Sequence, residues 1–318
     1  MADAGKPNWT RKFLAVTFVV LLGLAAAIAY VYYLPLPVLK PAGEKTLSHK
    51  IGGKPKTKVR PAKIDKRPTG TIIIDDIGYD MTALKRLLAM GVDFAFSVLP
   101  EAPRAADSAR LIRASGRELM VHIPCEPIDR KQMKGMRFLQ VDQDAAEIRT
   151  LAGDLLDLVP GAAGANNHMG SRFTANEKAT RALLGVIKSR GLFFVDSVTS
   201  WNTVAYQMAS GMGIKCLKRD IFLDHDPSAR AVQAQLDAFQ VLTKEKDGVV
   251  AIGHPHENTV AVLGKWVKNG AGGLKIIRPS KMIEHKMHKP TGQQKKQQVR
   301  QQGALLYENG KKRAKAGK

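Results

Sequence analysis

Acidic, amide and histidine side chains recur at the ends of short apolar runs in the middle of the chain. The groups are Asp75-Asp76, His122, Asn166-Asn167-His168, Asp196-Ser197, Arg219-Asp220 with Asp224, and Gly253-His254-Pro255-His256. Two neutral imidazoles and one carboxylate form a common three-ligand set for zinc-type ions, which leaves a position for water. Such an ion brings the pKa of its water from ~15.7 toward ~7. A second carboxylate can then act as general base and a further histidine can protonate a leaving amine. The residue types therefore indicate metal-assisted hydrolysis.

Each of these groups alone has an ordinary structural explanation. Asp75-Asp76 could form a turn that caps a helix, and Asp196 could cap the helix that follows it. His122 could be a buried histidine with a satisfied ring, and the segment 253–256 could be a loop shaped by its glycine and proline. Their shared position at strand ends favours a single site, because the carboxyl ends of parallel barrel strands converge on one face.

Apolar runs of strand length alternate with amphipathic segments of helix length from residue 71 to residue 285. The expected strands are 71–74, 93–99, 118–123, 164–167, 192–195, 215–222, 249–252 and 274–277. Between them, Asp144-x-x-Glu147 and Thr174-x-x-Glu177 have the spacing of helix capping boxes. Seven or eight such units predict an α/β protein with a distorted (β/α) barrel of seven to eight parallel strands.

The amino-terminal region determines the expected compartment. Residues 13–34 contain no charged side chain, and a helix of that length crosses a hydrocarbon core of ~30 Å. Basic residues before this run favour a cytoplasmic N-terminus. The alternative is a cleaved signal peptide with Ala27-Ile28-Ala29 as its small-x-small site, although the apolar run continues beyond it. In both cases the remainder is exported. We expect residues 1–34 to form a single-pass inner-membrane anchor, with the folded domain in the periplasm of a Gram-negative cell.

The strong positive charge is concentrated in two extensions of the chain. The formal net charge is +22, of which residues 1–70 contribute +10 and residues 285–318 contribute +9, leaving about +3 for the rest. Residues 35–70 are rich in Pro and Lys, and residues 286–318 in Gln and Lys. Because neither segment can bury a core, they predict a linker and a disordered basic tail around one domain at 71–285. A near-neutral exported domain is not expected to bind nucleic acid.

The chain has two cysteines, Cys125 and Cys216, which lack the spacing of metal ligands. We expect both to be buried small apolar side chains, although an oxidising compartment would permit one disulfide.

Six segments together resemble the divergent polysaccharide deacetylase family. They are Ile73-Ile74-Asp75-Asp76-Ile77-Gly78-Tyr79, Val121-His122-Ile123-Pro124 with Glu126-Pro127, Asn166-Asn167-His168-Met169-Gly170-Ser171, Asp196-Ser197, Arg219-Asp220 with Phe222-Leu223-Asp224, and Gly253-His254-Pro255-His256. They occur in order between about Thr71 and Ser280. The resemblance implies a distorted (β/α) barrel that hydrolyses N-acetyl groups of an amino sugar with a divalent metal such as zinc. The implied partner is an amino-sugar polysaccharide or a peptidoglycan-derived glycan.

The resemblance also implies catalytic and metal-binding roles by position. Asp75 corresponds to the general base, and His254 to the histidine that protonates the departing amine. Asp76 and His122 correspond to metal ligands.

The third ligand is less direct, because the superfamily's second motif has another histidine where this chain has Glu126. We expect His168 to replace that histidine, with Glu126 as the alternative ligand. The residues expected to orient the ligands or the substrate are Asn167, Asp196, Asp220 and His256. The altered motif leaves a second interpretation open, a non-catalytic envelope module that keeps the barrel and binds a glycan or a protein.

Overall fold

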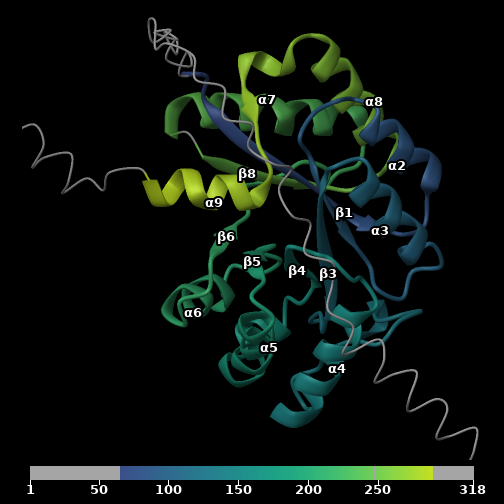
Figure 1. Ribbon diagram of the computed structural model, residues 1–318, viewed down its shortest axis with the longest axis vertical. Helices are drawn as coiled ribbons and strands as arrows, with labels where there is room; N and C mark the ends of the chain where they lie inside the picture. The colour runs from purple at the N-terminus through teal and green to yellow at the C-terminus, as the bar shows by residue number, and fades with distance from the viewer. Residues whose placement is uncertain (1–64, 247, 289–318) are drawn as a thin grey trace, which may run out of the picture. The chain divides into compact units, whose positions relative to one another are not determined.

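The computed structural model describes residues 65–246 and 248–288 (Figure 1). The expected membrane anchor, most of the expected linker, and the expected tail from residue 289 onward lie outside these residues. Within the described part, no helix is both long and apolar enough to cross a membrane.

Nine strands form one sheet in the described part of the chain. They are β1 (Thr69–Ile77), β2 (Ala95–Val98), β3 (Glu118–Cys125), β4 (Gly164–Met169), β5 (Phe193–Asp196), β6 (Cys216–Lys218), β7 (Ile221–Phe222), β8 (Val249–Gly253) and β9 (Lys275–Ile276). Their order is β6-β5-β4-β3-β2-β1-β8-β7, with β9 added to β1, and every pair is parallel. A parallel sheet needs helical crossovers, and these lie outside it (Figure 1).

The crossover helices alternate with the strands, except that β7 follows β6 with no helix between them. They are α2 (Met81–Leu88), α3 (Ala105–Ala114), α4 (Ala145–Asp157), α5 (Glu177–Ser189), α6 (Ala205–Gly211), α7 (Ala229–Lys246) and α8 (Glu257–Lys268), and α9 (Pro279–His288) follows the last strand. Short 3₁₀ turns occur at η1 (Arg130–Gln132), η2 (Phe173–Ala175) and η3 (Ala271–Gly273).

The barrel is distorted where the sheet should close. Within the described residues no ladder joins β6 to β7, although the sequence predicted one strand over 215–222. The chain crosses this gap at one peptide, since Arg219 N–H donates to the Asp196 carbonyl at 2.9 Å and Asp220 N–H donates to the Val250 carbonyl at 2.8 Å. One expected strand therefore becomes two strands on opposite edges. The prediction of a distorted (β/α) barrel is confirmed.

Local signals gave one correct helix start and one incorrect one. The capping box at Asp144 is present, with both of its reciprocal hydrogen bonds. The Thr174 box is wrong, because Thr174 lies in η2 and its hydroxyl donates to the Gly170 carbonyl at 2.9 Å. Asn176 caps α5 instead, accepting from Ala179 N–H at 2.9 Å.

The apolar core has two layers, because successive side chains of a strand point to opposite faces. One set packs between the sheet and the outer helices. The other set lies inside the barrel and consists of Ile73, Ala95, Met120, Phe193, Val195, Leu217, Val250 and Ile252, with Met282 and Ile283 of α9.

Helix α9 closes the amino-terminal end of the barrel. The Arg278 guanidinium just before it donates to Asp93 at 2.7 and 3.0 Å. At its first turn, Ser280 N–H donates to the Glu118 carboxylate at 2.9 Å. Asp93 and Glu118 stand near the starts of β2 and β3, so the opposite, carboxyl-terminal end is the one that remains open.

Two glycine substitutions should separate packing from helix propensity. On β4, a Cβ at Gly164 would lie 2.3 Å from the Phe193 ring, whereas at Gly185 on α5 no atom lies within 4 Å. We expect Gly164→Ala to lower the free energy of unfolding by about 1–3 kcal/mol, and Gly185→Ala to raise it by about 0.5–1 kcal/mol. Urea unfolding followed by circular dichroism measures both. Changes of the same sign in the two variants would contradict this account.

Candidate active site

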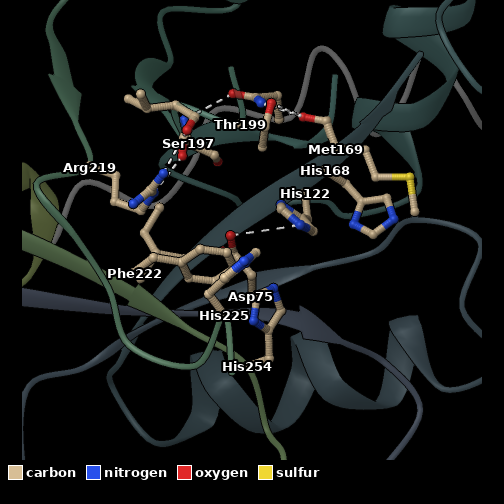
Figure 2. A pocket seen from close by; sticks show the side chains of 13 residues that line it. Asp75, His122, His168, Met169, Ser197, Thr199, Arg219, Phe222, His225 and His254 are labelled. Atoms are coloured by element: carbon tan, nitrogen blue, oxygen red, sulfur yellow. Dashed lines mark hydrogen bonds and ion pairs between the residues drawn. The ribbon is translucent and has the colours of Figure 1, made fainter. Parts of the chain in front are cut away.

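The inner layer of the barrel changes from apolar to polar toward its open end. On most strands, an inward-facing apolar or small side chain is followed two residues later by a polar side chain on the same face. These pairs are Ile73/Asp75, Ala95/Ser97, Met120/His122, Gly164/Asn166, Val195/Ser197, Leu217/Arg219 and Ile252/His254. Five of the polar members, Asp75, His122, Ser197, Arg219 and His254, line a pocket of about 370 Å³ (Figure 2). Ser97 and Asn166 are fully buried behind it.

Asp75 and Asp76 both belong to this site because β1 is irregular at that point. The pairing of β1 with β2 shifts register between Ile74 and Ile77, and Asp76 has a left-handed backbone with φ 53°. A regular strand would send the two side chains to opposite faces. The bulge turns Asp76 toward the same cluster, and bulges of this kind are frequent beside active sites.

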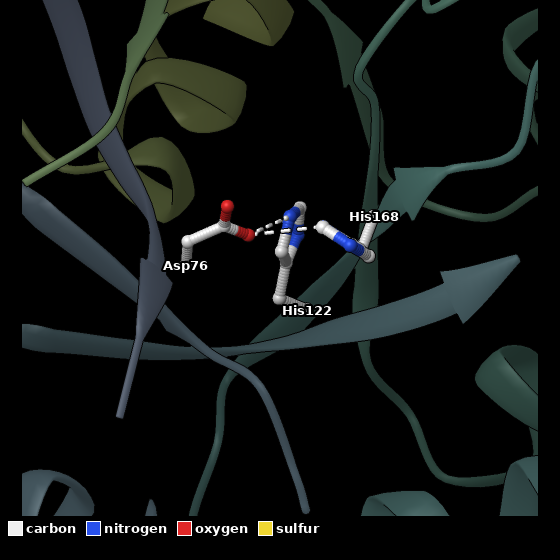
Figure 3. A group of neighbouring side chains, drawn as sticks. All are labelled: Asp76, His122 and His168. Carbon is white, nitrogen blue, oxygen red and sulfur yellow. Dashed lines mark ion pairs between the residues drawn. The ribbon is translucent and has the colours of Figure 1, made fainter. Parts of the chain in front are cut away.

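Asp76, His122 and His168 converge on one point (Figure 3). Asp76 Oδ1 lies 3.2 Å from His122 Nε2 and 2.9 Å from His168 Nδ1. This oxygen is buried, yet neither ring nitrogen meets it in hydrogen-bonding geometry. A buried polar atom without a partner is costly, and a cation between the three atoms would satisfy it. The donor set, two imidazoles and one carboxylate, fits a zinc-type divalent ion.

Asn166 links the metal-ligand cluster to the second carboxylate. Its amide oxygen lies 2.6 Å from Ser97 Oγ and 2.9 Å from His122 Nδ1. Its amide nitrogen donates to both oxygens of Asp75 at 2.9 Å and to Ser197 Oγ at 3.2 Å. Because Nδ1 of His122 must carry the proton to donate to this oxygen, Nε2 keeps the lone pair that a metal requires.

The fully buried Asn166 side chain should therefore contribute strongly to stability and metal affinity. Asn166→Ala leaves Asp75, His122 and Ser97 without this partner, at about 1–3 kcal/mol for each unsatisfied group. We expect the free energy of unfolding to fall by about 3 kcal/mol or more, and metal affinity to fall about 10–100-fold. Urea unfolding and a competitive chelator titration measure the two effects.

Asn176→Ala is the matched control for this variant, because it removes only the α5 cap. That change should cost about 1 kcal/mol and leave metal affinity unchanged. Equal losses of stability in the two variants would show that the Asn166 network contributes no more than a helix cap.

The two neighbouring aspartates have opposite acid–base character. Burial raises the pKa of Asp75, which is 2% exposed. Burial also works against ionisation of Asp76, but the His122 and His168 rings outweigh it and hold the pKa of Asp76 well below its usual range. Asp76 is thus suited to remain an anionic ligand, and Asp75 to accept a proton.

His254 and Asp224 form a hydrogen-bonded pair on the opposite side of the pocket. Nδ1 of His254 lies 2.9 Å from Asp224 Oδ1, and His254 N–H donates to Oδ2 at 2.6 Å. Thr259 Oγ1 also donates to Oδ2, at 2.8 Å. Burial lowers the pKa of His254, but Asp224 and the two site aspartates outweigh it and raise that pKa to about 9. His254 Nε2 faces the site, 3.9 Å from Asp76 Oδ2.

Strained backbone surrounds the pocket on three strands. Met169, the last residue of β4, and Val198, two residues after β5, line the pocket and have φ 52° and 49°. Together with Asp76, they are three of four non-glycine residues with positive φ among the described residues. Such strain commonly occurs at functional sites. The Arg219 guanidinium supports this wall by donating to the carbonyls of Ser197 and Val198, both at 2.6 Å.

Four predicted site residues do not join the cluster. Asp196 caps α6, where it accepts from Thr203 Oγ1 at 3.0 Å and Tyr206 N–H at 3.1 Å. The carboxylate of Asp220 pairs with Lys246 at 2.8 Å and accepts from Val250 N–H. Asp196 has the outward-facing parity of β5, Asp220 lies between β6 and β7, and neither lines the pocket.

Glu126 and His256 also stand apart from the metal-ligand cluster. The buried Glu126 carboxylate accepts from Arg130 Nε at 2.5 Å and Val141 N–H at 2.7 Å, so it is engaged in a structural ion pair. His256 is exposed at the start of α8. Its ring lies 5.6 Å from the His254 ring, outside the residues that line the pocket.

The remaining predicted residues meet at the pocket, together with others to which sequence reasoning gave no role. Asn167 lines the pocket and its oxygen accepts from Ser197 N–H at 3.0 Å. Sequence reasoning placed Asn166, Arg219 and Asp224 among the candidate groups at strand ends without giving them a role, and it missed His225, which lines the pocket. A period-two count from the apolar inner residues finds Asn166 and Arg219, whereas nothing in the sequence alone distinguishes His225.

Comparison with known proteins agrees with this geometry. The family model described as divergent polysaccharide deacetylase matches residues 72–283. The chain belongs to the divergent polysaccharide deacetylase family. The resemblance inferred from the six segments is thereby confirmed.

Two curated proteins of similar sequence are both described as uncharacterized. The chain is 32% identical to YibQ of Escherichia coli over 212 residues, 67% of this chain. The match spans 66% of that protein, just under two thirds of its length. This chain is also 31% identical to a protein of Haemophilus influenzae over 224 residues, which cover 67% of this chain and 80% of the Haemophilus protein.

A solved structure supports the fold of this family member. The crystal structure of an uncharacterized protein from Agrobacterium tumefaciens superimposes with a TM-score of 0.60 at 20% identity. The alignment covers 69% of this chain and 89% of the other.

Both thiols are free, as expected for small apolar side chains rather than a disulfide. Cys125 is fully buried and Cys216 is partly buried. Burial raises the pKa of each thiol, so neither is suited to act as a nucleophile.

Proposed function

We propose that the protein is a divalent-metal-dependent hydrolase that removes N-acetyl groups from an amino-sugar polymer of the cell envelope. The observation that carries the proposal is the buried Asp76 Oδ1 atom, which lacks a hydrogen-bond partner and faces two imidazole nitrogens. Membership of the divergent polysaccharide deacetylase family supports a carbohydrate substrate. Asp76, His122 and His168 would hold the metal, with zinc as the expected ion.

When bound, the metal would activate water and polarise the acetyl carbonyl oxygen. Asp75 stands beside the ligand cluster, with Oδ2 3.7 Å from His122 Nε2, and its raised pKa suits it to take the proton of the attacking water. A bond forms between the water oxygen and the acetyl carbon, and the carbon–nitrogen bond breaks. His254 supplies a proton to the departing nitrogen, so the products are acetate and a free amino sugar.

We further propose that this reaction takes place in the periplasm, with residues 13–34 as an inner-membrane anchor. The uncharged apolar run at 13–34 and the basic residues before it support this location. Alkaline phosphatase fused after residue 318 should be active if the carboxyl end is periplasmic. An active cytoplasmic reporter at the same position would contradict it.

The central test measures metal content and acetate release together. Full-length protein purified without chelator should contain near one equivalent of a divalent metal and release acetate from N-acetylglucosamine oligomers or peptidoglycan glycans. Asp75→Asn should keep the metal and lose turnover by about 10²–10⁴-fold. Protein that takes up no metal after reconstitution would refute the proposal and favour a non-catalytic envelope module. Metal uptake without acetate release from any tested glycan would refute the deacetylase assignment.

A further inference from the structure

Large exposed apolar side chains gather around the open end of the barrel. Trp201 is 94% exposed, Ile128 is 70% exposed and Tyr79 is 53% exposed. They lie in the loops that follow β5, β3 and β1, just beyond the site residues of those strands. An almost fully exposed tryptophan contributes little to packing, and exposed aromatics beside a pocket indicate a binding surface.

The loop that carries Trp201 is held firmly against the site. Arg219 fixes the carbonyls of Ser197 and Val198, and Thr199 Oγ1 donates to the Met169 carbonyl at 2.8 Å. Val204 N–H closes the other end of the loop by donating to the Thr174 carbonyl at 2.9 Å. Because Thr199 lines the pocket, Trp201 stands within about 7 Å of chain from the pocket wall.

Tyr79 lies in the loop after β1, as Trp201 lies in the loop after β5, and strands β2, β3 and β4 separate the two. Tyr79 follows Asp76 by three residues, and its loop is fixed where Arg104 N–H donates to the Gly78 carbonyl at 2.8 Å. Four strand spacings separate β1 from β5, about 19 Å along the sheet. The two aromatic rings therefore stand at the ends of the segment of sheet that supplies Asp76, His122 and His168.

We propose that Trp201 and Tyr79 are stacking platforms for two pyranose rings of one glycan chain, so that the site acts on internal residues of an extended polymer. This inference rests on the proposed function and assigns the two residues that would hold sugar rings of the polymer beside the reacting one. Sugar rings present apolar C–H faces to aromatic rings and hydroxyls to polar neighbours. Trp201 is flanked by Ser200 and Asn202, and Tyr79 by Gly78 and Asp80. Each aromatic therefore has small or polar residues as its neighbours along the chain, which suits a hydrated glycan better than a lipid surface.

Calorimetric binding to full-length Asp75→Asn protein tests the proposal without turnover. The probes are N-acetylglucosamine and its pentamer. Adding Trp201→Ala or Tyr79→Ala should weaken pentamer binding about tenfold and leave monomer binding unchanged. Trp201→Phe should restore most of the affinity. Val241→Ala, at a 57% exposed position of α7, is the matched control and should change neither affinity.

The outcomes separate this inference from the proposed function. If wild-type protein releases acetate but Trp201→Ala binds the pentamer as before, the platform is refuted and the hydrolase stands. If pentamer binding depends on Trp201 in a protein that never releases acetate, the stacking role of Trp201 is supported and the proposed hydrolase function is refuted. Unchanged pentamer affinity together with lost self-association in sedimentation velocity would assign Trp201 to a contact between copies, and would also overturn the inference.

Discussion

Replacing Asp76 with asparagine should abolish stoichiometric metal binding and, with it, acetate release. The amide cannot supply an anionic ligand to the point where His122 and His168 converge. The loss of affinity should exceed the about 10–100-fold that removal of an outer partner costs. Elemental analysis and a chelator titration of the full-length protein measure it directly.

The same substitution should leave the fold intact, which makes the result interpretable. Asparagine accepts the left-handed backbone that Asp76 adopts at φ 53°. The metal-free protein should lose some stability, because the carboxylate that His122 and His168 stabilise is gone, while the increase in melting temperature on adding metal disappears. Asp142→Asn is the control, because it removes an exposed carboxylate that pairs with Arg130. Metal retained at one equivalent in Asp76→Asn would place the ion elsewhere.

Replacing His254 with glutamine should lower kcat about 10²–10⁴-fold without loss of the metal, because the leaving nitrogen then lacks its proton donor. The pH–rate profile gives a further signature. A histidine with a raised pKa is protonated at neutral pH and loses its proton as pH rises through that pKa, here about 9. Wild-type activity should therefore fall on the alkaline side. A cation held at Asp76 lowers the His254 pKa, so the fall occurs at or below pH 9.

Asp224→Asn tests the origin of this alkaline limb. Without the carboxylate beside Nδ1, the pKa of His254 should drop, and the limb should move to lower pH. The variant should also lose about 1–3 kcal/mol of stability, because Asp224 accepts three hydrogen bonds. An alkaline limb that does not move in Asp224→Asn would show that another group donates the proton. Thr259→Val removes one of the same bonds without removing the charge, and it should leave the limb in place.

The fold was largely readable from the sequence because the strands are apolar runs at regular intervals. Where the sequence misled, tertiary pairing decided the outcome. The run 215–222 reads as one strand, but Arg219 pairs toward β5 and Asp220 toward β8. Nothing local marks that division. Asn176 likewise took the capping role expected of Thr174, because Thr174 bonds back to Gly170.

The sequence predicted where the site lies, at the carboxyl ends of the strands, better than it predicted the role of each residue there. Position at a strand end identifies candidates such as Asp196, but only strand parity tells which face the side chain takes. Parity in turn fails for Asp76, which the bulge and left-handed backbone bring into the cluster. The role of Asn166 depends on Ser97, His122 and Asp75, which come from three other strands, and on Ser197 just after a fourth. Such a network exists only after the barrel has formed.

The chain enters the described domain at the end of the barrel opposite the pocket. The carboxylate of Asp65, the first described residue, lies 3.6 Å from the ammonium of Lys275 at the start of β9, and β1 and β9 both begin at the end of the barrel opposite the pocket. The described chain therefore enters the domain at the closed end of the barrel. The loops around the pocket, including those that carry Tyr79 and Trp201, are separate from this point of entry.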